Sequence, residues 1–220
     1  NMSHEPEVTL FAQQKDNSIY LMLMAIPPKN EVFKKSKRSR ELIFIIDSSG
    51  SMSGSSIKQA KDSLNAAIKR LKPSDRFNII DFDSYFEPLY ESAMLATNSR
   101  INEATRFIRK IDADGGTEML APIKFALKSR DLESEKYLRQ IVFITDGQSG
   151  NEEAIFKTVE FDIENDRFFT IGIGSAPNSY LLTKLADFGR GAFTYIGSQN
   201  EVRQKMNRLF EKLESPALTD

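Results

Sequence analysis

Beyond Arg40 the chain alternates short apolar runs with longer stretches that mix apolar and polar residues. The apolar runs are "LIFII", "RFNIIDF", "QIVFIT", "RFFTIGI" and "AFTYIG". They are nearly continuous in apolar residues, which is typical of strands that helices cover on both faces. Strands and helices that take turns along a chain form parallel sheets. We therefore predict an α/β fold built on a doubly wound parallel sheet.

The mixed stretches carry apolar residues at the three- and four-residue steps of a helix. The first stripe consists of Ile57, Ala60, Leu64, Ile68 and Leu71, and Pro73 follows its end. A second stripe begins after Asn98, which we expect to be the N-cap of that helix. Further helices are expected around 120–130, 151–163, 178–188 and 199–214. Pro88 lacks a backbone N–H, so a strand over 85–91 would belong at a sheet edge.

The first forty residues have a different pattern. Two strand-like runs flank a "KDNS" turn and end at Pro27 and Pro28, which predicts a β-hairpin-like extension. We expect residues 1–40 to form this extension, with 1–6 outside the fold. The main domain is expected over 41–215, followed by a short tail over 216–220.

Composition narrows the classes of function. Thirty basic and thirty-one acidic residues give the 220-residue chain a formal net charge of -1, which argues against nucleic acid as a partner. Because cysteine is absent, thiolate metal sites and cysteine nucleophiles are excluded. No apolar run approaches the roughly 20 residues of a membrane span, so we expect no membrane insertion.

Polar oxygen donors follow the first buried run. Asp47, Ser49 and Ser51 are spaced two apart, so an extended backbone would send all three side chains to one side. They lie at the carboxyl end of the predicted sheet, where α/β proteins bind ligands. A carboxylate and two hydroxyls suit Mg²⁺, Mn²⁺ or Ca²⁺. On this stretch alone, simple capping of the next helix explains the residues equally well.

Two further loops favour a metal site. "DGGTEM" carries Thr117 behind two glycines, and "FITDGQSG" carries Asp146 at the end of another apolar run. The carboxyl ends of parallel strands meet at one edge of the sheet. We therefore expect these donors to converge with the first loop.

Taken together, "DSSGS", "GGT" and "TDG" resemble the metal-ion-dependent adhesion site of the von Willebrand factor type A domain. The resemblance implies a Rossmann-like, mostly parallel sheet with one short antiparallel edge strand, and a site that usually holds Mg²⁺. Longer stretches, such as "LKPSDRFNIIDFDS", are similar to inter-alpha-trypsin inhibitor heavy chains and to marine proteobacterial sortase target proteins. This similarity implies a noncatalytic module of a larger, surface-exposed or secreted protein from a bacterium.

The same resemblance implies how the site works. Ser49, Ser51 and Thr117 would bind the metal directly, while Asp47 and Asp146 would supply charge and hold waters. An Asp or Glu of a protein, extracellular-matrix or cell-surface partner would complete the coordination sphere. The residues expected to form a partner-binding rim are Ser48, Met52, Ser53, Asp83, Glu118 and Gln148, with Met52 as an apolar contact.

Other functions stay open at this stage. A Mg²⁺-dependent phosphatase or phosphotransferase could use Asp47 as nucleophile, but no lysine or arginine follows before Lys58 to hold a phosphate. A serine hydrolase would need a base, and the only histidine is His4. A metal-stabilised spacer between other domains of the same protein is the main alternative to adhesion.

Three smaller features have ordinary structural explanations. Asp81 and Asp83 could form a second metal site, but turn capping explains aspartates at a strand end more simply. The "GIGSAPNS" stretch lacks the ending of a phosphate loop, and Asn178 or Ser179 more plausibly begins a helix. The last helix, whose apolar stripe includes Met206 and Phe210, is expected to pack statically rather than to switch.

Overall fold

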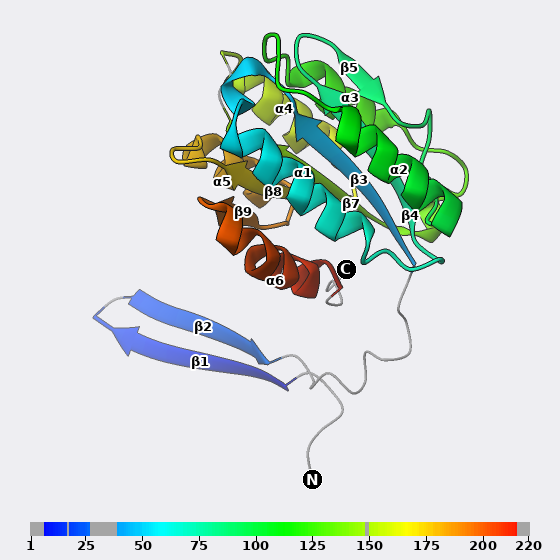
Figure 1. Cartoon of the computed structure of the whole chain (residues 1–220). Coiled ribbons are helices and arrows are strands. Elements are labelled where there is room, and N and C mark those ends of the chain that lie inside the picture. The colour runs from blue at the N-terminus through cyan, green and yellow to red at the C-terminus, as the bar shows by residue number, and fades with distance from the viewer. Residues whose placement is uncertain (1–6, 17, 27–38, 148–149, 215–220) are drawn as a thin grey trace. The chain divides into compact units, whose positions relative to one another are not determined.

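The structure is a computed structural model that describes residues 7–16, 18–26, 39–147 and 150–214. The chain divides into two compact units, one containing the two N-terminal strands and the other containing residues 38–215. Figure 1 shows the elements of both units.

The N-terminal unit is a β-hairpin, as the sequence predicts. Strand β1 (Glu7–Lys15) pairs antiparallel with β2 (Ser18–Ile26), and Lys15 lies opposite Ser18 at the turn. Asp16 adopts a positive φ of 53° there, a conformation that aspartate tolerates better than most residues. Consecutive apolar residues such as Leu10 and Phe11 are exposed, so both faces of the hairpin carry apolar side chains.

The second unit contains a seven-stranded sheet with the order β5-β4-β3-β7-β8-β9, with β6 paired to β4. The strands are β3 (Arg40–Asp47), β4 (Arg76–Phe82), β5 (Phe86–Pro88), β6 (Met94–Leu95), β7 (Leu138–Thr145), β8 (Arg167–Ile173) and β9 (Phe193–Ile196). The α-helices are α1 (Ser55–Ile68), α2 (Asn98–Lys110), α3 (Leu120–Lys128), α4 (Glu152–Asp162), α5 (Ser179–Phe188) and α6 (Val202–Glu214). Short 3₁₀ turns are η2 (Gly50–Met52), η3 (Ser134–Lys136) and η4 (Gln199–Glu201).

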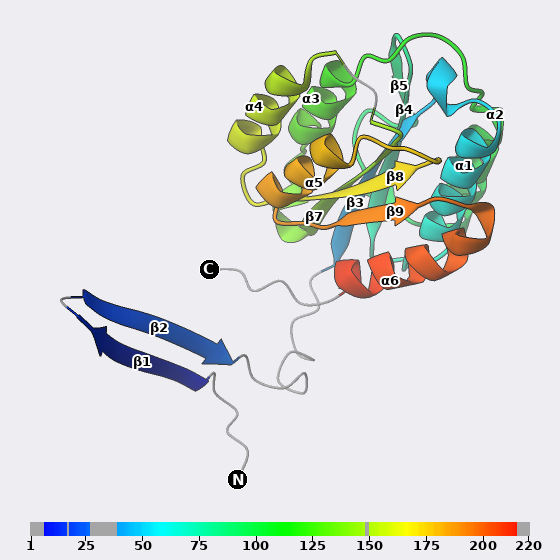
Figure 2. The same ribbon diagram turned by 90° about the vertical axis from the view of Figure 1, so that its left-hand side faces the viewer.

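The sheet is covered by helices on both faces, which confirms the predicted α/β architecture. Helices α1, α2 and α6 pack on one face and α3, α4 and α5 on the other, as Figure 2 shows. Every residue of β3 is buried, because this strand lies in the middle of the sheet. The parallel pairing of β3 with β4 and β7 brings the carboxyl ends of these three strands together.

The edge of the sheet departs from parallel pairing. Strand β5 pairs antiparallel with β4 and places Pro88 opposite Ile80 at the sheet edge, where its missing N–H breaks no ladder. The two-residue strand β6 also pairs antiparallel with β4. The sequence pattern did not predict β6, because two residues are too few to show a period.

One predicted helix cap is wrong. Helix α2 begins at Asn98, but its N-cap is Thr97, whose side chain accepts a hydrogen bond from the Arg100 backbone N–H. Thr97 has the extended backbone that an N-cap requires. Asn98 is therefore the first helical residue rather than the cap.

Buried charges gather at the amino ends of the central strands. Glu41 is fully buried and accepts a hydrogen bond of 2.8 Å from Arg139 Nε. Arg76 Nη1 lies 3.2 Å from the same carboxylate, and Arg139 Nη1 also contacts Asp166 at 2.5 Å. These residues come from β3, β4, β7 and the turn before β8, so the ion pairs link the strands at the end of the sheet opposite to Asp47.

Candidate metal centre

The first part of the candidate site is the turn that follows β3. Asp47 and Ser49 are fully buried, and the backbone N–H of Ser49 donates to Asp47 Oδ1 at 2.9 Å. The backbone does not stay extended as predicted, because the chain enters the 3₁₀ turn η2 directly after Ser49. This turn nevertheless places Ser51 Oγ 3.1 Å from Ser49 Oγ. Two hydroxyl oxygens therefore lie side by side in the turn that follows the buried carboxylate.

The second part is the loop that carries Thr117. The Gly50 N–H donates to the Gly115 carbonyl at 3.1 Å, and the Asp114 N–H donates to the Ser48 carbonyl at 2.9 Å. Gly115 has a φ of +79°, and a Cβ at this position would lie 2.9 Å from Asp83 Oδ2. Glycine is therefore required for this loop to lie against its neighbours. Thr117 itself is half-buried.

The third part is the end of β7. Asp146 follows this strand directly and is 7% exposed. The preceding residue, Thr145, donates its hydroxyl to Asp47 Oδ2 and accepts a hydrogen bond of 2.8 Å from the Gly147 N–H. Thr145 thus ties the β7 loop to the carboxylate of β3. Thr145 was not among the residues predicted for the site, although its position before Asp146, at the end of a buried strand, was a usable signal.

The buried negative charge of the site favours a cation. Burial raises the pKa of the Asp47 carboxyl, hydrogen bonds from Ser49 and Thr145 oppose that change, and the nearby charge of Asp146 adds to the increase. Two buried acidic groups close together favour a positive ion between or in front of them. Among the described residues no group of three or more His, Cys, Asp or Glu could hold a metal, so hydroxyl oxygens would have to share the task.

These donors fit a hard divalent cation. The oxygens present are carboxylates and hydroxyls, which Mg²⁺, Mn²⁺ and Ca²⁺ accept, and softer metals prefer nitrogen or sulfur. With few carboxylates, such a site would leave room for an outside oxygen. Helix capping, the alternative explanation of these residues, accounts for them only in part, because neither η2 nor α1 has a side-chain hydrogen bond at its N-cap.

The predicted rim residues differ in their exposure. Ser53 and Glu118 are exposed and Asp83 is half-buried, so these three can face a partner. Met52 is wrong as an apolar contact, because it is fully buried in the core beneath η2. Ser48 is also wrong, because it is 3% exposed and its hydroxyl donates to the Phe82 carbonyl at 3.0 Å. Gln148 lies outside the described residues.

The two aspartates after β4 differ in role. Asp83 Oδ1 accepts a hydrogen bond of 2.8 Å from the Tyr85 N–H, and the Asp83 carbonyl accepts one of 2.7 Å from the Glu118 N–H. Asp83 therefore shapes the turn, as the simpler interpretation predicts. Asp81 Oδ1 is buried with no hydrogen-bond partner, and burial raises the pKa of Asp81 to about 6.

Helix α5 settles the interpretation of the glycine-rich stretch before it. Asn178 is the N-cap of this helix, and its Oδ1 accepts a hydrogen bond of 3.1 Å from the Leu181 N–H. The stretch therefore ends in a helix start, as expected. None of the described helices is long and apolar enough to cross a membrane.

Comparisons with known proteins agree with this architecture. A family model described as the von Willebrand factor type A domain matches residues 40–195. A von Willebrand factor A domain-containing protein of Dictyostelium discoideum is 30% identical over 219 residues, which is 99% of this chain and 23% of that protein. The mouse von Willebrand factor A domain-containing protein 5B1 is 30% identical over 202 residues, covering 91% of this chain and 16% of that protein.

Solved structures share the fold at lower identity. A structure described as von Willebrand factor type A from Catenulispora acidiphila has a TM-score of 0.70 and 18% identity, and the match covers 94% of this chain and 49% of that chain. The manganese-loaded TRAP protein of Plasmodium vivax has a TM-score of 0.59 and 20% identity, with 78% and 73% covered. This chain spans less than a quarter of the length of the curated relatives described above.

Proposed function

Because this chain belongs to the von Willebrand factor type A domain family, we propose that it is a noncatalytic protein-binding module whose binding depends on a divalent cation. Domains of this family commonly bind a divalent metal and mediate interactions between proteins. We place the proposed site where β3, β7 and the Thr117 loop meet, and it would use five donors: Asp47, Ser49, Ser51, Thr117 and Asp146.

The residues of the site would divide the work by chemistry. Ser49, Ser51 and Thr117 offer neutral hydroxyl oxygens as direct ligands, so they add no charge to the coordination sphere. Asp47 and Asp146 supply the negative charge and hold ordered waters. When bound, the cation, for which Mg²⁺ is our first choice with Mn²⁺ or Ca²⁺ as alternatives, would act as a Lewis acid toward one outside carboxylate.

One observation carries this proposal most strongly. Ser49 Oγ and Ser51 Oγ lie 3.1 Å apart in the turn that follows a fully buried aspartate that Thr145 and the Ser49 N–H both hold in place. Serines that only cap a helix would not need a buried carboxylate held in place beside them. Hydroxyl and carboxylate oxygens that are already held close together support a site for a hard cation.

The partner would be a protein or matrix component that presents an Asp or Glu. Of the residues that surround the site, Ser53, Asp83 and Glu118 remain available to contact it. Two acidic side chains among these three would disfavour further acidic groups in the partner next to its coordinating carboxylate. This would contribute to the choice of partner.

The cellular setting follows from the same proposal. We propose a cell-surface or secreted location within a longer protein, in which 41–215 is the binding domain, 1–40 an extension and 216–220 a tail. The similarity to inter-alpha-trypsin inhibitor heavy chains and bacterial sortase targets motivates this setting. The relatives described above are from Dictyostelium and mouse, so a bacterial source stays a prediction.

Thermal unfolding tests the metal site directly. Wild type, Asp47→Asn and Ser49→Ala would each be melted in EDTA and in Mg²⁺, Mn²⁺ or Ca²⁺. A cation at roughly a hundred times its Kd stabilises a protein by about 2.7 kcal/mol. For a chain of this size we expect a rise in Tm of about 5–10 °C in the wild type. Ser55→Ala removes an exposed hydroxyl outside the ligand set and is the matched control, because this hydroxyl has no hydrogen-bond partner among the described residues.

The outcome depends on the difference between the two buffers within each variant, so a variant that is less stable overall can still be compared. The rise should vanish in Asp47→Asn and shrink in Ser49→Ala, and it should persist in Ser55→Ala. An unchanged Tm in the wild type with all three cations would overturn the proposal.

A second measurement separates adhesion from the spacer alternative. N-acetylaspartate amide carries the same side-chain carboxylate as an aspartate of a partner. Adding it should shift the backbone N–H signals of Ser51 and Thr117 in NMR spectra recorded in Mg²⁺ but not in EDTA. Metal-dependent stability without any such carboxylate binding would favour a metal-stabilised spacer.

A further inference from the structure

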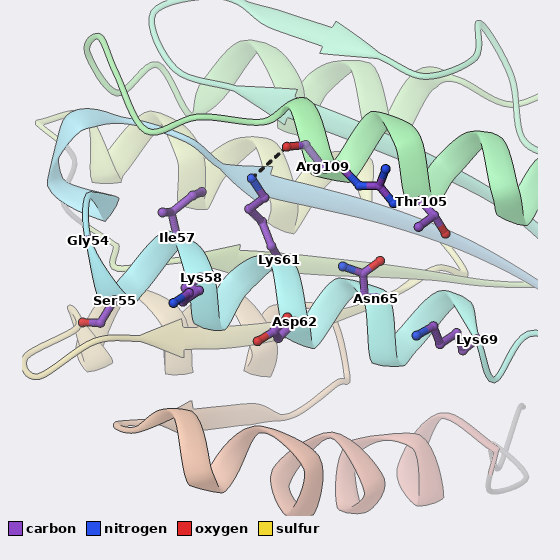
Figure 3. A pocket seen from close by; sticks show the side chains of 10 residues that line it. All are labelled: Gly54, Ser55, Ile57, Lys58, Lys61, Asp62, Asn65, Lys69, Thr105 and Arg109. Atoms are coloured by element: carbon purple, nitrogen blue, oxygen red, sulfur yellow. Dashed lines mark hydrogen bonds between the residues drawn. The ribbon is translucent and has the colours of Figure 1, made fainter.

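A groove runs between α1 and α2, and Gly54 and Ser55, just after the turn of the candidate metal centre, line one end of it. It is open, has a volume of about 780 Å³, and is lined by Lys58, Lys61 and Lys69 of α1 and by Arg109 of α2. Figure 3 shows the Arg109 side chain reaching from α2 toward α1, on which the lysines lie. We propose that this groove binds an extended acidic segment of a polypeptide, independently of any metal.

Three of the four cations are available to such a ligand. Lys61 is already engaged, because its Nζ donates to the carbonyls of Arg109 at 3.1 Å and of Ile111 at 2.5 Å, at the end of α2. The side chains of Lys58, Lys69 and Arg109 are exposed and form no hydrogen bond or ion pair with another residue in the described part of the chain. Their charges are therefore not neutralised within the described fold.

The one acid in the groove does not cancel this charge. Asp62 accepts a hydrogen bond from Gln199 Nε2 on the side of η4, so it is turned toward another partner. The groove thus has an excess of positive charge although the whole chain has a formal net charge of -1. A local excess on a nearly neutral protein selects a local acidic partner rather than a long polyanion.

The spacing of the cations fits an extended peptide. Positions 58, 62, 65 and 69 follow one another at steps of four and three residues, so they share one face of α1. Lys58 and Lys69 are eleven positions apart, which corresponds to about 16 Å along a helix. An extended chain covers this length with about five residues at roughly 3.3 Å each. Arg109 faces the stretch between them, because Lys61 contacts the Arg109 carbonyl.

The neutral side chains of the groove favour a polypeptide over a sulfated glycan. Asn65 Oδ1 is a buried acceptor without a hydrogen-bond partner among the described residues. Thr105 donates its hydroxyl to the Ile101 carbonyl at 2.8 Å and therefore presents oxygen lone pairs to the groove. A peptide brings regularly spaced N–H donors along with its carboxylates, and these suit acceptors placed between cations.

Fluorescence anisotropy of a labelled peptide with about six glutamates, a length that covers the groove, tests the proposal in EDTA at low salt. A peptide with glutamine in place of glutamate is the neutral control. The triple variant K58E/K69E/R109E should weaken binding of the acidic peptide by at least about tenfold, which corresponds to 1.4 kcal/mol or more. Binding to the wild type should fall between about 50 mM and about 300 mM NaCl, because salt screens exposed charges.

A matched variant separates the groove from total charge. K124E/K128E/R208E makes the same change in net charge at exposed residues of α3 and α6 with no partner among the described residues, and it should bind the peptide within about twofold of the wild type. Equal weakening by both triple variants would overturn the proposal, as would equal binding by the wild type and K58E/K69E/R109E. Binding of a heparin oligosaccharide without binding of the peptide would assign the groove to sulfated glycans instead.

The test also distinguishes this groove from the metal centre. Asp47→Asn should bind the acidic peptide as well as the wild type does, in EDTA and in Mg²⁺. Peptide binding that requires Mg²⁺ and disappears in Asp47→Asn would place the peptide at the metal centre, which would overturn the groove proposal and leave the proposed function standing.

Discussion

At the scale of single residues, the candidate site depends on side chains that position the proposed metal ligands through hydrogen bonds. The fully buried Thr145 hydroxyl donates a hydrogen bond to the Asp47 carboxylate and accepts one from the Gly147 N–H. This hydroxyl thereby links the loop after β7 to the carboxylate of β3. A residue that only orients another can matter as much as a ligand, because an unfixed carboxylate would lose its place in a buried site.

Thr145→Val tests this role. The variant keeps the shape of the side chain but leaves a buried carboxylate oxygen and a backbone N–H without a partner, which costs about 1–3 kcal/mol. We expect a loss of this size in the free energy of unfolding in EDTA, measured with urea, and a smaller rise in Tm when Mg²⁺ is added. Thr145→Ser retains the hydroxyl and should restore most of the metal-dependent rise. Identical Mg²⁺ responses in the wild type and Thr145→Val would show that Thr145 does not position the site.

Asp81 makes stability depend on pH in the opposite direction to a usual carboxylate. Burial raises its pKa to about 6, and the nearby charges of Asp83 and Glu87 add to the increase. An unfolded aspartate titrates near 3.9. Because the unfolded state loses this proton at lower pH than the folded state, the folded protein loses stability as the pH rises from about 4 to about 6.

Asp81→Asn removes the ionisable group and tests this account. Above about pH 6 the variant should be more stable than the wild type by about 1–3 kcal/mol, and the difference should shrink toward zero below about pH 4. Urea unfolding at several pH values measures this. A difference that stays constant from pH 4 to pH 8 would contradict the pKa assignment.

At the scale of elements, the sequence predicted the helices and strands that have a repeated pattern of apolar residues. The stripes of α1 and α6 and the apolar runs of the parallel strands agree with the structure, because a period persists over many residues and the core selects it. Features decided by one or two residues were harder to predict. Thr97 and Asn98 are both acceptable caps, and only the backbone conformation, which is extended at Thr97, distinguishes them.

The cap of α2 can be tested with a pair of substitutions. Thr97→Ala removes the side-chain oxygen that accepts from the Arg100 N–H, and it should lower the free energy of unfolding by about 0.5–2 kcal/mol. Asn98→Ala is the matched control, because this exposed residue lies inside the helix, where alanine is favourable. Chemical denaturation of both variants would measure the contrast. A greater loss of stability in Asn98→Ala than in Thr97→Ala would restore the cap that the sequence suggested.

At the scale of the whole molecule, the five proposed donors could be found because they follow buried strands or glycine pairs. The sequence also predicted that they converge, but it did not predict the detailed geometry of the first loop. The 3₁₀ turn that brings Ser51 to Ser49, and the burial of Met52 and Ser48, depend on how the loop packs on Gly115 and Phe82. Such contacts join residues more than thirty positions apart, and no local pattern records them.

The two ends of the sheet carry different kinds of polar structure. At the carboxyl ends, hydroxyls and carboxylates lie where we propose that a cation binds. At the amino ends, Glu41 is fully buried and paired with Arg76 and Arg139, and no side of it faces solvent. We infer that this second cluster serves the fold alone, so changes there should affect stability without changing the response to metal.

Glu41→Gln tests this separation of roles. The substitution leaves two buried guanidinium groups without their shared charge partner, and breaking a buried pair in this way costs about 3–5 kcal/mol. We expect a loss of that order in urea unfolding, whereas Glu133→Gln, which breaks the exposed pair with Lys136, should cause no measurable change. The rise in Tm on adding Mg²⁺ should be the same in Glu41→Gln as in the wild type. A reduced rise in Glu41→Gln, but not in Glu133→Gln, would mean that the network at the amino ends is coupled through the sheet to the metal centre, because β3 carries both Glu41 and Asp47.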